Sequence, residues 1–462
     1  MAPKFGTSGL RGLVTELTPD LVGAHVRAFL RACPVGSGLY VARDLRSSSP
    51  AIAAVVIAAA QAEGVAVTDC GAVPTPALAL AAMGAGAAAV MVTGSHIPDD
   101  RNGLKFYTPE GELTKAGEAA ILAALPAPAR EVALGSLSLA DPAPAYLARY
   151  RTAFGPTALA GQRIGVWSHS AVGRDLLIAS LESLGAEVEE IARSDRFIPV
   201  DTEAVPPEAR AMLRAEAQVR GLAAIVSTDG DGDRPLVTDA TGEVVPGDLL
   251  GQITARMLGA EVVVTPVSSN SGAEAGGHFA RVIRTKIGSP FVIAAMEAAG
   301  GRVVGYEANG GFLLGFDAQG PAGPLPALMT RDSHLPILAP LVLAGKAGLA
   351  ALVAAEPPRF TAADRLQEVP TAHSAALVTQ LTDDADALAA FLAGLGERCT
   401  ARDLTDGLRL TLASGRVVHL RPSGNAPELR FYAEAETPAA AAALLAAGLA
   451  ALQHRLREAL PG

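Results

Sequence analysis

Strand-like and helix-like segments alternate through the first three quarters of the chain, and this alternation restricts its fold more than any other feature. Short apolar runs at 39–42, 65–68 and 87–92 have the character of strands, and the segments 51–63 and 75–83 between them that of helices. This order predicts a largely parallel sheet with helices packed against it.

The same alternation returns twice, with little identity between the sequences but with the same layout. Such repetition indicates duplicated α/β units. The further predicted helices are 114–125, 173–184, 206–218 and 290–299, and the further predicted strands are 163–166, 187–191, 222–227, 262–265, 282–284 and 303–306.

The chain beyond Pro358 has a different pattern. Strands expected at 408–412, 417–421 and 429–434 follow one another through short turns, which indicates antiparallel pairing. Helices are expected at 385–395 and 438–460. The predicted class is α/β, with three similar mixed α/β domains plus a C-terminal α+β domain around a central cleft, and with domain boundaries at 1–140, 141–244, 245–356 and 357–462.

Composition and charge exclude several classes of partner. The chain of 462 residues has a formal net charge of −10 and no run of lysines or arginines, so nucleic acid is not an expected partner. Its three cysteines lie far apart without metal-ligand spacing, which suits the reducing cytoplasm. No membrane segment is expected, because prolines and glycines interrupt the nearly uncharged stretch 72–92.

A loop rich in reactive side chains follows the predicted strand 87–92. It holds Ser95, His96, the charged residues 99–101 and Lys105, so one short segment offers a possible nucleophile, proton carriers and cations. In α/β folds, loops at the carboxyl ends of strands display such groups. The alternative is an ordinary polar turn.

The clearest metal-binding pattern is formed by Asp229, Asp231 and Asp233, which only two glycines separate. Three alternate carboxylates can direct oxygens to one hard cation, and they would repel one another without it. An EF-hand is excluded, because Arg234 and Ala240 stand where that loop needs glycine and glutamate. Mg²⁺ is expected over Ca²⁺, and the alternative is a solvated acidic turn.

Together, the serine loop and the aspartates suggest phosphoryl transfer, in which a serine oxygen carries or attacks a phosphoryl group and Mg²⁺ neutralises its charge. The glycine-rich segment 5–12 carries Arg11, which could bind a phosphate, although a plain N-terminal turn is the alternative. The chain has no Gly-x-x-x-x-Gly-Lys-Ser/Thr loop for a nucleotide triphosphate and no Gly-x-Ser-x-Gly segment of a serine hydrolase.

In their order and spacing, these motifs resemble those of the α-D-phosphohexomutase family, and the resemblance covers essentially the whole chain. It is closest to the phosphomannomutase/phosphoglucomutase branch. The matching segments are 5–12, 93–98, 102–106, 229–234, 307–310 and 421–424.

The resemblance implies a role for each matching residue. Ser95 would be a phosphoserine that binds Mg²⁺ together with Asp229, Asp231 and Asp233. The remaining implied roles are acid/base and charge-stabilising work by Lys105 and Arg11 with His96 nearby, substrate binding by Arg234, Lys286, Glu307 and Asn309, and phosphate binding by Arg421, Ser423, Gly424 and Asn425. Before the resemblance is considered, each of these could also be an ordinary surface or turn residue.

Several positions depart from the family pattern. Gly94 and Ile97 replace the usual alanine and asparagine of the serine loop, and Asn425 and Ala426 replace a threonine and a glutamate of the phosphate loop. In the sugar loop Asn309 stands for serine, and Gly311 stands for a histidine that serves as an acid/base elsewhere in the family. Sugar preference is therefore less constrained than reaction class.

The resemblance implies a cytoplasmic, Mg²⁺-dependent mutase that interconverts hexose 6-phosphate and hexose 1-phosphate through a hexose 1,6-bisphosphate, which also serves as activator. Mannose phosphates are the expected substrates, with glucose phosphates second. Phosphoglucosamine mutase activity and a non-catalytic sugar-phosphate-binding protein are the alternatives. The protein is expected to be a monomer or a weak homodimer.

Overall fold

A computed structural model of the chain describes residues 3–6, 9–423 and 427–459. The chain forms two compact units, of which unit 1 comprises Met1–Val264 and Gly288–Val353, and unit 2 comprises Thr265–Ile287 and Ala354–Gly462. The division into four domains at 140, 244 and 356 stays a prediction.

The N-terminal part of unit 1 is built on a mixed eight-stranded sheet with strand order β1-β2-β6-β5-β3-β4-β8, in which β7 pairs with β6. Strands β3, β4, β5 and β8 pair in parallel, whereas β1, β2, β6 and β7 are antiparallel to their neighbours. The strands are β1 (Lys4–Phe5), β2 (Leu10–Leu13), β3 (Leu39–Arg43), β4 (Val67–Ala72), β5 (Ala88–Val92), β6 (Arg101–Thr108), β7 (Gly111–Glu112) and β8 (Leu137–Leu139).

The strands predicted at 39–42, 65–68 and 87–92 are β3, β4 and β5, and their parallel pairing is confirmed. The sheet as a whole is mixed and not largely parallel, because β1, β2, β6 and β7 pair antiparallel. The segment 101–105, which was expected to belong to the serine loop, is the first part of β6, and β6 runs antiparallel to β5. Lys105 thus projects from a strand and not from a loop. The expected helix, loop and strand over 72–92 are confirmed as α3 (Thr75–Gly84) followed by β5.

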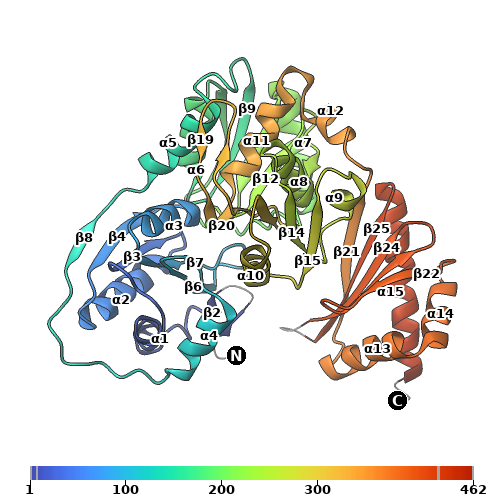
Figure 1. The fold of residues 1–462 in the computed structure, drawn as a ribbon, viewed down its shortest axis with the longest axis horizontal. Helices are drawn as coiled ribbons and strands as arrows, with labels where there is room; N and C mark the ends of the chain where they lie inside the picture. The colour runs from blue at the N-terminus through green and yellow to red at the C-terminus, as the bar shows by residue number, and fades with distance from the viewer. Residues whose placement is uncertain (1–2, 7–8, 424–426, 460–462) are drawn as a thin grey trace. The chain divides into compact units, whose positions relative to one another are not determined.

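Helices cover both faces of this sheet, as Figure 1 shows. Val41 and Val90 pack in one hydrophobic cluster with residues of α1 (Pro19–Ala32) and α2 (Ser49–Ala62). Their strand neighbours, among them Met91, pack with α3 in another. Because both faces are covered, every residue of β5 is buried. The remaining helix of this part is α4 (Lys115–Ala123).

The rest of unit 1 contains the strand orders β10-β9-β11-β12-β13, β14-β16-β17-β20 and the two-stranded β18-β19. The strands are β9 (Arg163–His169), β10 (Glu187–Arg193), β11 (Ala224–Thr228), β12 (Pro235–Thr238), β13 (Val244–Val245), β14 (Val262–Pro266), β16 (Val303–Tyr306), β17 (Phe312–Leu314), β18 (Ala318–Gln319), β19 (Pro324–Leu325) and β20 (Leu328–Asp332). The helices are α5 (Ala143–Phe154), α6 (Arg174–Ser183), α7 (Pro207–Arg220), α8 (Gly247–Met257), α10 (Ser289–Ala299), α11 (His334–Ala344) and the short η1 (Gly345–Ala347) and α12 (Leu349–Ala354).

The three motif loops of unit 1 occupy equivalent places in these sheets. Each follows a strand that pairs in parallel with its neighbour, and each returns the chain antiparallel to that strand: β5 to β6, β11 to β12, and β16 to β17. The repeated layout expected from the sequence is thus a repeated strand, loop and strand hairpin.

Unit 2 is an α+β structure, as expected for the C-terminal part. Its antiparallel sheet has the order β21-β25-β24-β23-β22, and α15 packs against β21 and β25 (Figure 1). Its elements are α9 (Gly272–Ala275), β15 (Arg281–Thr285), β21 (Phe360–Gln367), α13 (Thr371–Asp383), α14 (Ala385–Ala393), β22 (Cys399–Asp403), β23 (Leu408–Leu412), β24 (Val417–Pro422), β25 (Glu428–Ala435) and α15 (Pro438–Ala459).

Within the described part of the chain, α15 is the one helix whose length and composition would allow it to cross a membrane. This is weak evidence for a span, because core helices pass the same test. Leu444 and Leu452 of α15 pack with Phe431 of β25 in the hydrophobic core of unit 2. The apolar face of α15 is therefore used in packing against its own sheet.

Gly448, in the middle of α15, offers a test of this packing. A Cβ atom at this position would lie 2.2 Å from two ring carbons of Phe431. Alanine normally favours a helix over glycine by about 1 kcal/mol, but here the overlap should reverse the effect. We expect Gly448→Ala to lower the free energy of unfolding by about 1–3 kcal/mol in chemical denaturation.

The control is Gly84→Ala, at the exposed end of α3, where nothing lies within 4 Å of the added Cβ. Its effect should stay within about 1 kcal/mol. Equal stability of the two variants would show that α15 does not press on Phe431 in this way.

Candidate active site

Ser95 lies at the start of the loop between β5 and β6 and is 1% exposed. Its Oγ donates a hydrogen bond to Asp229 Oδ2 at 2.7 Å. Its backbone has a φ of 54°, in the left-handed region that non-glycine residues rarely adopt, and its N–H donates to Thr93 Oγ1 at 2.7 Å. The structure thus brings the expected nucleophile next to the first expected metal ligand.

A buried arginine, Arg46, holds the serine loop in shape. Its guanidinium donates to the carbonyl oxygens of Ser95, Ile97, Pro98 and Arg101 at 2.6–3.0 Å. Asp44 carries the opposing charge, with an Oδ2 that accepts from Arg46 Nε at 3.2 Å and from the Thr93 hydroxyl at 2.7 Å. The backbone carbonyls of the serine loop and of the start of β6 are therefore satisfied by one buried side chain.

The aspartate loop connects β11 to β12, and the side chain of Asp229 binds the backbone of the residues that follow it. Asp229 Oδ1 accepts the N–H groups of Gly232, Asp233 and Arg234 at 3.1–3.3 Å. A Cβ at Gly230 would lie 2.8 Å from the carbonyl oxygen of Ser95, so glycine is needed there for the approach of the two loops.

The three aspartates suit a hard divalent cation. All are fully buried, and one carboxylate oxygen of each lies within 4.8 Å of the others. The Oδ1 atoms of Asp231 and Asp233 are buried without a hydrogen-bond partner in the described part of the chain. Because buried carboxylate oxygens without partners are costly, this donor set fits a metal ion such as Mg²⁺.

The pKa values of Asp229 and Asp233 are shifted in opposite directions. Burial, together with the charges of Asp231 and Asp233, raises the pKa of Asp229 well above its usual value. The pKa of Asp233 is lowered although burial opposes this, because Arg331 and Lys105 favour its charged form. The loop therefore depends on neighbouring cations to keep its charge.

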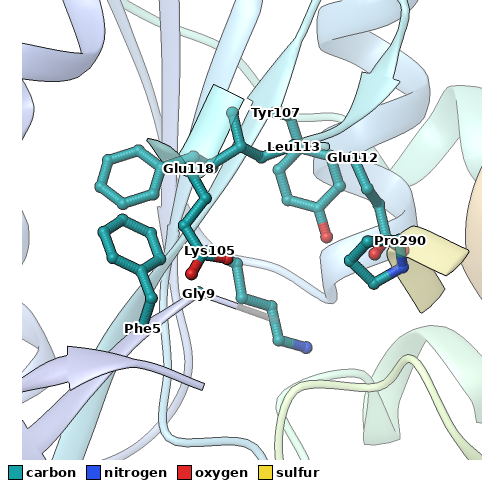
Figure 2. A pocket seen from close by; sticks show the side chains of 9 residues that line it. Phe5, Gly9, Lys105, Tyr107, Glu112, Leu113, Glu118 and Pro290 are labelled. Carbon is teal, nitrogen blue, oxygen red and sulfur yellow. The ribbon is translucent and has the colours of Figure 1, made fainter. Parts of the chain in front are cut away.

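Lys105 supplies one of these cations from β6. Its Nζ donates to Asp231 Oδ2 at 2.5 Å and to Asp233 Oδ2 at 2.6 Å, and its residue is only 4% exposed. Its side chain lines a small cavity of about 20 Å³. Figure 2 shows Lys105 at this cavity together with Tyr107, whose hydroxyl points toward Glu112 and Pro290. The surface-lysine alternative is thus excluded for Lys105.

His96 and the two arginines expected at the site also lie in this region. Arg234 Nη1 lies 2.8 Å from His96 Nδ1, and that nitrogen lies 3.2 Å from Ser95 Oγ. Burial, with the charges of Arg234 and Arg11, lowers the pKa of His96 to about 2, so the ring is neutral. Burial and Arg234 also lower the pKa of Arg11 to about 10.

The sugar loop, which follows β16, lies close to the aspartate loop. Glu307 and Asn309 are 5% and 7% exposed. Asn309 Oδ1 accepts the N–H of Gly311 at 3.0 Å, and the Asn309 amide reaches Glu307 Oε2 at 3.5 Å. Arg331, from the end of β20, lies between the loops, with Nη2 3.0 Å from Asp233 Oδ2 and Nη1 3.7 Å from Glu307 Oε2.

The remaining expected residues lie in unit 2. Arg421 Nε is 3.0 Å from Asp406 Oδ2, and the same oxygen accepts the N–H of Ile287 at 3.1 Å. Asp406 therefore joins the loop of Lys286 to the loop of Arg421 and Ser423. Two further expected phosphate-binding residues, Gly424 and Asn425, lie outside the described residues.

Sequence reasoning missed several residues that support the site, namely Asp44, Arg46, Glu112, Arg331 and Asp406. A signal existed for the first pair, because Asp44 and Arg46 directly follow the predicted strand 39–42, as reactive loops do in α/β folds. Arg331 gave no comparable signal, because its charge partners are all distant in sequence.

Comparison with known proteins gives a consistent result. Residues 2–129, 246–360 and 370–452 match the family models described as Phosphoglucomutase/phosphomannomutase, alpha/beta/alpha domain I, alpha/beta/alpha domain III and C-terminal domain. The chain is 46% identical to a phosphomannomutase of Sinorhizobium fredii over 99% of this chain and 100% of the relative. It is 42% identical to a phosphomannomutase of Salmonella muenchen, over 94% and 92%.

The fold also matches solved structures. A phosphoglucomutase/phosphomannomutase family protein from Burkholderia thailandensis superimposes with a TM-score of 0.79 at 22% identity, over 99% of this chain and 98% of that one. At this identity the likeness shows the multi-domain α/β fold alone.

Replacement of Arg46 should test how the serine loop is held. Arg46→Ala removes the partner of buried Asp44 and leaves four loop carbonyls without their donor. We expect the free energy of unfolding to fall by about 3–5 kcal/mol in chemical denaturation. The matched control is Arg302→Ala, because exposed Arg302 also donates to backbone carbonyls, those of Leu258 and Gly259. It should cost about 1 kcal/mol, and a similar loss in both variants would argue against the special role of Arg46.

Proposed function

The chain belongs to the phosphoglucomutase/phosphomannomutase family and is a mutase, and from this premise we propose that it interconverts the 6-phosphate and 1-phosphate of a hexose, most readily mannose. The observation that carries the proposal is the contact of Ser95 Oγ with Asp229, 2.7 Å apart, beside two buried carboxylate oxygens that have no hydrogen-bond partner in the described part of the chain. A phosphorylatable hydroxyl next to a cation site is what a phosphoserine mutase needs.

In the proposed reaction, phosphorylated Ser95 transfers its phosphoryl group to the free hydroxyl of a hexose monophosphate. The bond between Oγ and phosphorus breaks, a bond from the sugar oxygen to phosphorus forms, and the sugar hydroxyl gives up its proton. The resulting hexose 1,6-bisphosphate then reverses its orientation in the site. In this orientation it returns its other phosphoryl group to Ser95. Free bisphosphate would act as activator, because it rephosphorylates the serine.

Mg²⁺, held by phosphorylated Ser95, Asp229, Asp231 and Asp233, would neutralise negative charge on the transferring group. Lys105 and Arg11 are proposed to stabilise charge and to handle the proton at the reacting hydroxyl, with His96 placing the serine loop. Because the His96 ring is neutral, it adds no positive charge at Ser95.

Substrate binding is assigned to two groups of residues. Arg234, Glu307 and Asn309 of unit 1, with Lys286 of unit 2, are proposed to contact the sugar. Arg421 and Ser423, with Gly424 and Asn425, are proposed to hold the phosphate that does not react. A fixed distal phosphate would keep the reacting hydroxyl in position during transfer.

The proposed setting is cytoplasmic, with the protein acting as a monomer or weak homodimer on small sugar phosphates. Glucosamine phosphate is the nearest alternative substrate, because phosphoglucosamine mutases are also relatives of the chain. They are more distant than the phosphomannomutases, as the enzyme of Alkalilimnicola ehrlichii at 32% identity illustrates. A non-catalytic binding protein is disfavoured, because it would not need a buried serine hydrogen-bonded to an aspartate of a cation site.

Ser95 provides the direct test of the chemistry. Intact-mass analysis should show one phosphate, which peptide mapping should locate on Ser95. Ser95→Ala should reduce turnover by about 10⁴-fold or more, since the serine carries the covalent intermediate, whereas calorimetry should still detect sugar-phosphate binding. Full activity of Ser95→Ala would contradict the proposed mechanism. Ser37→Ala is the matched control, since Ser37 is exposed and its hydroxyl donates only to Ala85 O, and it should retain full turnover.

Sugar preference is tested by a substrate panel. Mannose, glucose and glucosamine 1-phosphates would be compared with a catalytic trace of the matching 1,6-bisphosphate and with Mg²⁺ present. We expect kcat/KM to be about tenfold or more higher for mannose 1-phosphate than for glucosamine 1-phosphate, because contacts that suit one hydroxyl pattern discriminate at this level. The reverse order would favour the glucosamine alternative.

A further inference from the structure

Arg331 is a buried cation that contacts three carboxylates from three different parts of unit 1. Its Nε lies 3.3 Å from Glu112 Oε1, its Nη2 lies 3.0 Å from Asp233 Oδ2, and its Nη1 lies 3.7 Å from Glu307 Oε2. The side chain is only 3% exposed. Each edge of one planar group therefore faces a different acid.

Glu112 fixes the base of this arrangement. Its Oε1 also accepts the backbone N–H of Arg331 at 3.0 Å and the Thr330 hydroxyl at 3.2 Å, while its Oε2 accepts from Ser289 Oγ at 2.7 Å. Because both the backbone and the side chain of Arg331 are tied to one carboxylate, the guanidinium has little freedom to turn.

The two other partners belong to the proposed machinery. Asp233 is a proposed metal ligand, and Glu307 is proposed to contact the sugar. A guanidinium can hold two such groups at a fixed separation, because its donors lie in one rigid plane. A lysine ammonium, which is a point charge on a flexible stem, would not fix that separation.

The absence of a side chain at Gly311 leaves space for the side chain of Arg331. A Cβ atom at position 311 would lie 3.0 Å from Arg331 Cδ and 3.1 Å from Arg331 Cγ. The added atom would also lie 3.2 Å from Asn309 Oδ1, so a larger side chain at 311 would press on both Arg331 and Asn309. This is the position at which the family pattern commonly has a histidine.

We propose that Arg331 is a positioning residue that fixes Glu307 relative to Asp233, and that the missing side chain at Gly311 makes this possible. The inference rests on the proposed function, because it assigns Glu307 to the sugar. Arg331 acts through Glu307, so its loss should weaken sugar binding only where Glu307 can still form its own contact.

The test is a double-mutant cycle on the Ser95→Ala protein, in which sugar-phosphate binding is measured without turnover. Calorimetry with mannose 1-phosphate and Mg²⁺ would compare Arg331→Met with its parent, and the same pair in a Glu307→Gln background. We expect about tenfold weaker binding for Arg331→Met in the first pair and less than about twofold in the second.

Two further variants keep the result interpretable if Arg331→Met folds poorly. Gly311→Ala, which presses on Arg331 without removing it, should weaken binding about threefold, and this effect should vanish when Arg331 is also replaced. Arg331→Lys should recover only part of the affinity, because it restores the charge but not the planar donor group.

Arg174→Met is the matched control. Arg174 is also a buried arginine, but it donates to the carbonyl oxygens of His169 and Ser194. Its replacement should lower the melting temperature and leave the affinity for mannose 1-phosphate within about twofold.

An equal loss of affinity in both Glu307 backgrounds, or no loss in either, would overturn the positioning role. The proposed function is tested separately, by turnover and serine phosphorylation of the unmodified protein. Mutase activity together with an uncoupled Arg331 would therefore contradict this inference alone.

Discussion

Buried negative charge is the constraint on which the rest of unit 1 depends. Asp229, Asp231 and Asp233 are fully buried on one short loop, and isolated carboxylates in such a place would lose their charge or unfold the loop. Cations from other strands prevent this, since Lys105 comes from β6 and Arg331 from β20. The charge of the aspartate loop is therefore balanced only when strands from different sheets bring their cations to it.

The three hairpins explain how distant residues reach one site. In each sheet a buried parallel strand ends in a polar loop and the chain returns antiparallel, so the reactive groups of 93–98, 229–234 and 307–311 are delivered in equivalent ways. The loops then fit closely, as the 2.8 Å approach that a Cβ at Gly230 would make to the Ser95 carbonyl shows. Glycine is needed in that loop for contact between loops as much as for the turn itself.

Much of this was predictable from the sequence where the pattern is local. Strands such as 87–92, the aspartate loop and the C-terminal antiparallel strands follow from apolar runs and turn residues, and the structure confirms them. The antiparallel direction of β6 was missed, because the polar segment that begins it resembles a loop. Arg46 and Arg331 were missed because their roles depend on partners far along the chain, which no local spacing reveals. Roles for the individual site residues, and the convergence of Lys286 and Arg421 with the other loops, stay predictions.

The position of Lys105 has a consequence for the charge balance of the aspartate loop. Its ammonium lies against Asp231 and Asp233, at 2.5 and 2.6 Å, so the loop carries a counter-ion that belongs to the chain itself. The charge balance of this loop therefore comes in part from the chain itself, unlike that of small domains that are unfolded without metal. The amine engages only one oxygen of each carboxylate, and the Oδ1 atoms of Asp231 and Asp233 are left for a further positive charge.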